Sequence, residues 1–303
     1  MPSSVISLQP EYPLESRTLK VHTFGQARDA ANALNQDRRT RVLGGGTLIM
    51  RKINEGTADF DGLIRTTDPA LKRIRTDSSR IELGAAVTMA AILATPELSF
   101  LHAVAAAVGG PAIRQMATIG GNLFAPVPYG DFAVALLALD ARVQVQASFG
   151  TREGALDAIL RGPGESSPQL VCSVTFNRPR PGQTLRYHKV ARVQPKGVSV
   201  LSLAACFGAR GERLSSVRLA AGALAPSPIR LSRLERALEG QRLHAAAVDT
   251  ALQQLQADIT PPTDAIASAR YRRAVAPVYT HHTSRCEHRC INNVKPISDS
   301  FSQ

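Results

Sequence analysis

Apolar residues recur with two different periods along the chain, and together they predict a mixture of helices and strands. A helical period is clear in residues 26–37, and the continuous apolar run 132–139 is long enough for a buried helix. Residues 80–87 and 141–148 alternate as half-buried strands do, and a short apolar strand at 40–43 runs directly into three glycines. This first part of the chain is therefore expected to be a mixed α and β unit.

A composition break at residues 177–182, NRPRPG, separates this unit from a second one. Beyond it, the pattern predicts strands at 197–208 and 216–223 and helices at 230–238 and 244–257. Strands followed by helices that pack on them are typical of an α+β layer.

Length and composition favour a globular protein of two or three structural units, because 303 residues with 44% hydrophobic residues can bury a large core. No window reaches the roughly 18 to 20 apolar residues of a membrane span, and the first twenty residues lack the features of a signal peptide. The four cysteines are too few and too unevenly spread for a disulfide framework or an iron–sulfur cluster. We expect a cytoplasmic protein with free thiols and no membrane span.

The net charge of +12 comes almost entirely from the residues after 177, which include 19 Lys and Arg but only 8 Asp and Glu. Such asymmetry can indicate nucleic acid. Few aromatic residues stand between these arginines to stack on bases, however, so no nucleic acid is expected. An acidic protein partner or a solvated basic face fits better.

Two glycine clusters carry the strongest chemical signal. The first is Gly44-Gly45-Gly46-Thr47, directly after a strand, and the second is TIGGN, residues 118–122. Glycine allows phosphate oxygens to approach the backbone N–H groups closely. Neither cluster matches the phosphate-binding P-loop or the dinucleotide fingerprint, and each alone is compatible with an ordinary tight turn. Together they favour one extended diphosphate ligand held between two loops.

Three stretches give the chain a resemblance to a known family: RVLGGGTLIMRKINEG (41–56), GGPAIRQMATIGGNLFAPVPYGDFAVALLALDA (109–141) and RYHKVAR (186–192). They resemble the FAD-binding medium subunit of the molybdenum hydroxylases, the family of the carbon monoxide dehydrogenase medium subunit and the xanthine dehydrogenase flavin domain. The most specific part is ATIGGNL followed at fixed spacing by an aspartate and LLALDA. The likeness runs from about residue 10 to about residue 279.

The resemblance implies an α+β fold of the vanillyl-alcohol-oxidase-like (PCMH-type) FAD-binding class. Two FAD-binding subdomains are then expected at 1–60 and 61–177. A smaller α+β domain like the C-terminal domain of the carbon monoxide dehydrogenase flavoprotein would follow at 178–279, and an irregular tail at 280–303.

The resemblance also implies that FAD is the cofactor, that both glycine loops give backbone N–H groups to its diphosphate, and that the chain holds no catalytic side chain and no metal. The residues expected to contact FAD are Leu43, Gly44, Gly45, Gly46, Thr47, Leu48, Thr118, Gly120, Gly121, Asn122, Phe124, Asp131 and Lys189.

Some of these positions have a second interpretation. Asp131 could accept hydrogen bonds from the cofactor or cap the helix at 132–139, and the two roles are compatible. Phe124 could lie near the isoalloxazine or be a core aromatic residue. Lys189 could place a cation near the flavin or be an ordinary solvated lysine, and Lys196 is a weaker candidate for the same place.

The end of the chain departs from the family pattern. Cys286 and Cys290, with His281, His282 and His288, could bind zinc, but their spacing matches no standard structural site. We expect an unstructured end and no metal.

By resemblance, the chain is an FAD-binding electron-transfer subunit of a molybdenum-dependent hydroxylase. Electrons would come from [2Fe–2S] clusters on an iron–sulfur small subunit and leave through FAD to an external acceptor. A molybdopterin large subunit would act on the substrate, and a dimer of such heterotrimers is expected. The alternatives are a free-standing FAD-dependent oxidase of the same fold and a non-catalytic binding protein that has lost FAD.

Overall fold

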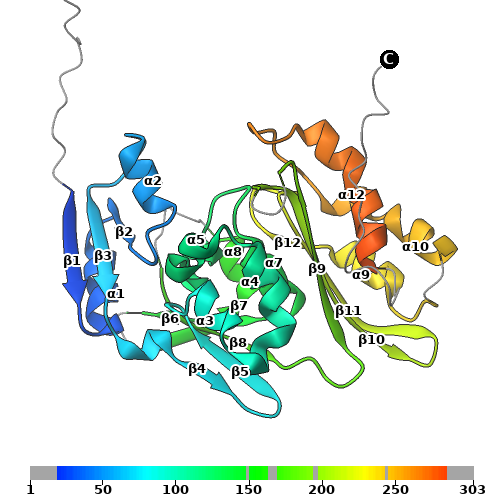
Figure 1. Ribbon diagram of the computed structural model, residues 1–303, viewed down its shortest axis with the longest axis horizontal. Helices are drawn as coiled ribbons and strands as arrows, with labels where there is room; N and C mark the ends of the chain where they lie inside the picture. Colours follow the sequence, from blue (N-terminus) through cyan, green and yellow to red (C-terminus); the bar gives the residue numbers. More distant parts are fainter. Residues whose placement is uncertain (1–18, 148–149, 163–168, 194–196, 243–244, 285–303) are drawn as a thin grey trace, which may run out of the picture.

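The protein is seen here in a computed structural model, which describes residues 19–147, 150–162, 169–193, 197–242 and 245–284 (Figure 1). Three β-sheets follow one another along the long axis of the molecule, in the order of the sequence. The predicted mixture of helices and strands is confirmed. None of the described helices combines the length and apolar character needed to cross a bilayer.

The first sheet is parallel, with β3 between β1 and β2, and helix α1 packs on it. The predicted helix at 26–37 is confirmed, because α1 buries the four apolar residues of that period. Strand β3 belongs to this sheet although it lies just beyond residue 60, where the sequence placed a boundary. The elements are β1 (Lys20–Phe24), α1 (Ala27–Gln36), β2 (Thr40–Val42), α2 (Ile49–Asn54) and β3 (Gly62–Thr66).

The second unit has a five-stranded antiparallel sheet in the order β4-β5-β8-β6-β7. Its strands are β4 (Ile74–Thr76), β5 (Arg80–Gly84), β6 (Arg142–Gln146), β7 (Thr151–Ala155) and β8 (Leu170–Asn177). Its helices are η1 (Pro69–Lys72), α3 (Met89–Leu93), η2 (Pro96–Leu101), α4 (His102–Ala107), α5 (Pro111–Met116), α6 (Ile119–Leu123), α7 (Asp131–Ala138) and α8 (Leu156–Leu160).

The third unit is a four-stranded antiparallel sheet in the order β12-β11-β10-β9, with helices packed on one face. Its strands are β9 (Thr184–Ala191), β10 (Ser199–Arg210), β11 (Arg213–Gly222) and β12 (Ile229–Arg230). Its helices are α9 (Ser232–Leu238), α10 (Ala245–Leu252), α11 (Leu255–Asp258) and α12 (Ala269–Ser284).

Helix α12 continues through residues 280–284, which the sequence assigned to the irregular tail. Thr280 and Thr283 are buried there, so this part of the helix packs against the rest of the unit. The candidate zinc ligands Cys286, His288 and Cys290 lie outside the described residues. Within the described part of the chain, no group of three or more His, Cys, Asp or Glu side chains could hold a metal ion.

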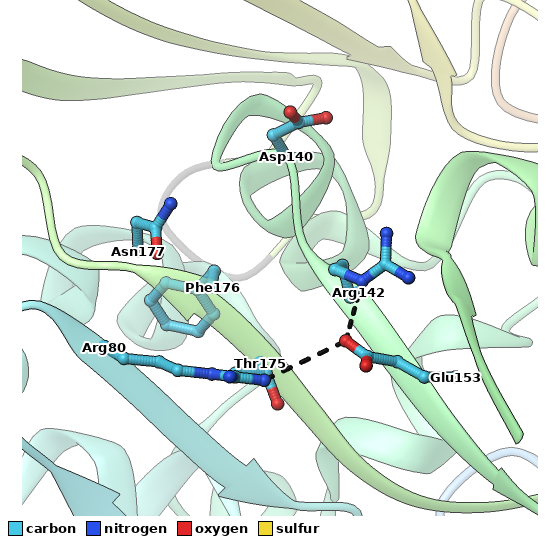
Figure 2. Close-up of a pocket in the computed structure, with 7 residues that line it drawn as sticks. All are labelled: Arg80, Asp140, Arg142, Glu153, Thr175, Phe176 and Asn177. Atoms are coloured by element: carbon cyan, nitrogen blue, oxygen red, sulfur yellow. Dashed lines mark hydrogen bonds and ion pairs between the residues drawn. The ribbon is translucent and has the colours of Figure 1, made fainter.

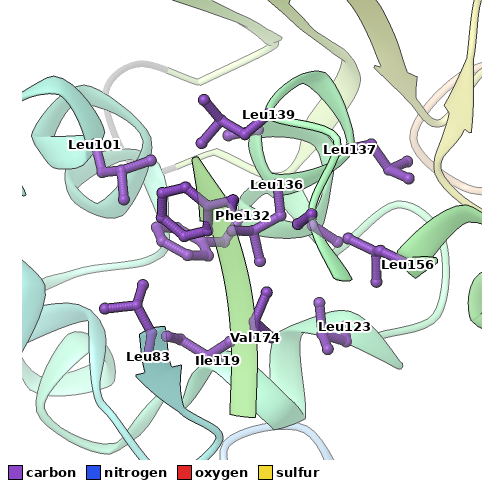
Figure 3. Packing of buried hydrophobic residues seen from close by; sticks show 14 of the residues in the cluster. Leu83, Leu101, Ile119, Leu123, Phe132, Leu136, Leu137, Leu139, Leu156 and Val174 are labelled. Atoms are coloured by element: carbon purple, nitrogen blue, oxygen red, sulfur yellow. The ribbon is translucent and has the colours of Figure 1, made fainter. Parts of the chain in front are cut away.

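Helix α7 joins the second unit to the third. All eight of its residues are buried, and it packs against α4 and α6 of its own unit as well as β10 and β11 of the third. One hydrophobic core therefore includes Phe132, which Figure 3 shows among its neighbours. Ala204 and Ala220 of the four-stranded sheet belong to the same core. The contact is close, since a Cβ atom on Gly222 would lie 2.8 Å from Val134 Cγ2.

The third unit contains a fully buried arginine, Arg272 on α12. Its Nε donates to Val200 O at 2.8 Å, and its Nη1 donates to Pro262 O at 2.6 Å and Ala267 O at 3.2 Å. Its Nη2 donates to both carboxylate oxygens of Asp264, at 3.0 and 2.8 Å. The guanidinium thus joins α12 to β10 and to the segment before the helix.

Replacing Arg272 with alanine should destabilise the protein strongly, because three carbonyls and a carboxylate each lose one hydrogen-bond donor. We expect Arg272→Ala to lower the free energy of unfolding in urea by roughly 3–5 kcal/mol. The neighbouring Arg273 is exposed, so Arg273→Ala should change the free energy of unfolding by less than about 0.5 kcal/mol. Equal losses for the two variants would contradict this account of the buried network.

The same network predicts a pH dependence. Partial burial opposes ionisation of Asp264, but Arg272 and two backbone N–H groups together hold its pKa below the ordinary 3.8. The stabilisation is therefore complete above that ordinary value and is lost as pH falls through the folded-state pKa. Between about pH 5 and about pH 3, Asp264→Asn should lose less unfolding free energy than the wild type. Urea unfolding of both proteins at the two pH values measures these losses. Equal losses of unfolding free energy in the wild type and Asp264→Asn would contradict the prediction.

Candidate functional site

The first glycine segment leaves the sheet and turns into α2. Leu43 N–H still donates to Ile64 O at 2.8 Å, which extends the pairing of β2 with β3. The turn then needs Gly46, whose φ of +77° is rarely adopted by residues with a side chain. Among the described residues, nothing accepts a hydrogen bond from the backbone N–H groups of residues 44–47. Four consecutive donors are therefore available to a ligand.

The second glycine segment is a short helix, α6, rather than an open loop. Thr118 caps it, because its Oγ1 accepts from Gly121 N–H at 3.2 Å. Gly120 N–H donates to Ala85 O at 2.8 Å and Asn122 N–H to Thr118 O at 3.0 Å. The resemblance implied N–H donors from both segments, but the donors of the second segment are already paired inside the chain.

The two glycine segments touch each other. A Cβ atom on Gly45 would lie only 1.6 Å from Met116 O, and one on Gly44 would lie 2.9 Å from Thr118 Oγ1. Close packing of the two backbones thus partly explains why Gly44 and Gly45 have no side chain. Gly121 is different: among the described residues, a Cβ there would meet only Thr118 Oγ1 within 4 Å, at 3.2 Å. A side chain at Gly121 would therefore press only on the Thr118 hydroxyl that caps α6.

Exposed apolar side chains lie beside the glycine segments. Met50 on α2 is 42% exposed, and Ile113 and Met116 on α5 are 43% and 56% exposed. Neither helix has a buried residue. The sequence analysis missed this apolar rim, because exposure cannot be read from three isolated hydrophobic residues. Free N–H donors beside apolar surface fit a ligand that has an anionic centre and apolar ends.

Asp131 and Lys189, predicted separately as cofactor contacts, form a buried ion pair. Lys189 Nζ donates to Asp131 Oδ2 at 2.9 Å and to Ala107 O at 2.9 Å, and Ser199 donates to Asp131 Oδ1 at 2.7 Å. The interpretation of Lys189 as a solvated lysine is wrong, since its side chain is 12% exposed. The capping role of Asp131 is also wrong, because Gly130 is the N-cap and the Asp131 carboxylate accepts from Lys189 and Ser199.

Tyr187 completes this group, which we call the Asp131 cluster: Asp131, Tyr187, Lys189 and Ser199. The Tyr187 hydroxyl is buried and has no hydrogen-bond partner among the described residues. Burial, together with the nearby Asp131 carboxylate, raises the pKa of this phenol. Sequence reasoning missed Tyr187 and Ser199, which come from β9 and β10 and lie far along the chain from Asp131.

The remaining predicted residues surround these features. Asn122 Oδ1 accepts from Ala133 N–H at 3.1 Å, so its side chain connects α6 to the first turn of α7. Phe124 is partly buried against the main core, as its second interpretation proposed. Leu48 is half-buried just before α2. Lys196 lies outside the described residues.

An open pocket on the five-stranded sheet is separate from this site (Figure 2). It lies at the Arg80 end of β5, whereas α6 contacts Ala85 beyond the opposite end of that strand. Its two arginines both lie near one carboxylate, since Arg142 Nε lies 2.6 Å from Glu153 Oε1 and Arg80 Nη2 lies 3.9 Å from it. The residues lining it are Arg80, Asp140, Arg142, Glu153, Thr175, Phe176 and Asn177.

Family models match almost the whole described chain. The model described as the FAD binding domain in molybdopterin dehydrogenase matches residues 17–176, more than half of the sequence. The model described as the CO dehydrogenase flavoprotein C-terminal domain matches residues 186–284.

Individual relatives agree with these matches. A putative xanthine dehydrogenase FAD-binding subunit of Escherichia coli is 24% identical, over 83% of this chain and 89% of the relative. The glyceraldehyde dehydrogenase medium chain of Sulfolobus acidocaldarius is 25% identical, over 89% of this chain and 97% of the relative. Among solved structures, a chain of carbon monoxide dehydrogenase from Hydrogenophaga pseudoflava has the same fold, with a TM-score of 0.81, 22% identity, and coverage of 88% of this chain and 95% of that one.

The resemblance seen in the sequence is thereby confirmed. The chain belongs to the family of FAD-binding flavoprotein subunits of the molybdopterin dehydrogenases, and it is therefore an oxidoreductase subunit whose cofactor is FAD.

Proposed function

We propose that this chain is the electron-transfer subunit of a molybdenum-dependent hydroxylase and that it holds the FAD diphosphate between its two glycine segments. The observation that carries the proposal is the row of four unpaired backbone N–H groups at residues 44–47, beside Thr118 and Gly121. Converging main-chain donors at a glycine turn bind phosphate oxygens well, because no Cβ keeps the anion away.

In this proposal the other predicted residues shape the rest of the site. The exposed rim formed by Met50, Ile113 and Met116 offers apolar surface to the ring systems of the cofactor. Asp131 keeps acceptor capacity for a ligand hydroxyl, because each of its oxygens accepts only one hydrogen bond, from Lys189 or from Ser199. Lys189 uses two of its three N–H donors inside the chain, so one remains for the cofactor.

Bound FAD supplies the redox chemistry, accepting electrons and passing them on, while the chain binds and orients it. We propose that the electrons come from [2Fe–2S] clusters of an iron–sulfur small subunit. The substrate would be hydroxylated on a molybdopterin large subunit, and an external acceptor would take the electrons from FAD. We further propose a dimer of such heterotrimers in the cytoplasm and a cofactor-binding fold of the vanillyl-alcohol-oxidase type.

Co-purification tests the proposed assembly. A tagged chain expressed in its own organism should bring down one protein that contains [2Fe–2S] clusters and one that contains molybdopterin. Substrate added to this complex should bleach the flavin absorption, and the isolated chain should show no oxidase turnover with the same substrate. Turnover with oxygen by the isolated chain would overturn the proposal in favour of a free-standing oxidase.

A second test concerns the glycine segment itself. Gly121→Val should leave a folded chain that no longer retains FAD, because a branched side chain fills the space beside the free N–H groups. Gly25→Val is a matched control, since a Cβ at Gly25 has no described atom within 4 Å. Flavin content after gel filtration measures retention, and circular dichroism checks the fold. Full flavin retention by Gly121→Val would show that the second segment is not a wall of the diphosphate site.

A further inference from the structure

We infer that the third unit helps to hold the FAD site in place, and that Ser199 is the positioning residue through which it does so. The inference rests on the proposed binding of FAD between the glycine segments. Ser199 lies on β10, in the C-terminal unit, and neither the glycine motifs nor the family resemblance pointed to it. It reaches the glycine site through a short series of hydrogen bonds that passes through the first turn of α7.

The first link joins α6 to α7. Asn122 belongs to α6, and its side-chain Oδ1 accepts from Ala133 N–H at 3.1 Å. Ala133 N–H lies in the first turn of α7, where it donates to Gly130 O at 3.1 Å and has the Asn122 oxygen as a second acceptor. The Asn122 side chain therefore does the work of a helix cap, while Gly130, at the cap position itself, has no side chain to offer. The place of α6 thus depends on the place of the α7 N-terminus.

The second link joins the same turn of α7 to the third unit. Asp131 is only 6% exposed, and its carboxylate takes one hydrogen bond from Ser199 and one from Lys189. A buried carboxylate needs such donors, because leaving one oxygen unpaired costs much of its desolvation free energy. Without the Ser199 hydroxyl, the carboxylate has to turn towards its remaining donors. The α7 N-terminus, and α6 with it, would then shift relative to the first glycine segment.

The other end of α7 provides a control. Asp140, just beyond the helix, accepts from Arg230 Nη1 at 2.9 Å, so it also connects the second unit to the third. About 12 Å of helix separates this contact from the Asp131 cluster. Its carboxylate is 66% exposed and makes no contact with α6 among the described residues. Asp140→Asn therefore weakens the contact between the units but leaves the hydrogen bonds between Ser199 and Asn122 unchanged.

The experiment compares FAD binding by the full chain and by its Ser199→Ala and Asp140→Asn variants, after removal of bound flavin and titration with FAD. Ser199→Ala should raise the dissociation constant about tenfold or more, because FAD binding then has to restore the position of α6, at a cost comparable to that of a hydrogen bond to a charged group. At saturating FAD it should also change the visible circular dichroism of the bound flavin. Asp140→Asn should leave both quantities at their wild-type values.

A measurement on the unmodified chain covers the case in which Ser199→Ala does not fold. Hydrogen exchange should show FAD binding slowing amide exchange in residues 199–204 of β10 as well as in residues 118–123. Residues 151–155 of the edge strand β7 should not change. The absence of any slowing in β10 would overturn the inference.

The outcomes separate this inference from the proposed function. A wild-type chain that binds no FAD would overturn the proposed function and this inference with it. A wild-type chain that binds FAD, together with a folded Ser199→Ala chain that binds it equally well, would overturn the inference alone. Equal weakening by Ser199→Ala and Asp140→Asn would also overturn it, because general docking of the units would then account for the effect.

Discussion

Helix α7 is the constraint on which the rest of the structure depends. A helix that is apolar on every side must be enclosed by other elements, because no face of it can be left to water. Here the elements that enclose it come from two units, the helices over the five-stranded sheet and the four-stranded sheet of the C-terminal half. Gly222 removes a side chain where β11 meets Val134, which allows the sheet to approach the helix closely. One face of the four-stranded sheet therefore belongs to the core of the second unit, while its other face packs in a separate core with the C-terminal helices.

The position of the candidate site follows from this shared core. The first turn of α7 contacts α6 through Asn122 and the C-terminal sheet through Asp131. The first glycine segment then packs backbone to backbone on the residues just before α6. The division of roles between the two segments is a result of hydrogen bonding: residues 44–47 keep free donors, whereas α6 uses its donors to stay in place. One segment can bind an anion, and the other forms the opposite wall.

The sequence predicted those parts of this arrangement that local chemistry determines. Periodicity was sufficient to predict α1, and the length of the apolar run was sufficient to predict α7. The chemistry of glycine next to threonine was sufficient to select both segments of the site. It did not predict that TIGGN forms a helix, because glycine is a poor helix former and the cap from Thr118 depends on a bridge to Thr88. It also gave Asp131 and Lys189 separate roles. They lie 58 positions apart, and only the packing of the two units makes them partners.

The central claim is that this chain itself carries FAD, and the visible absorption spectrum of the purified chain tests it most directly. Heat release and identification of the cofactor should follow. The account predicts a flavin spectrum and release of about one FAD per chain, as expected for a subunit that binds and orients its cofactor. A folded, colourless chain that cannot be reconstituted with added FAD would contradict it.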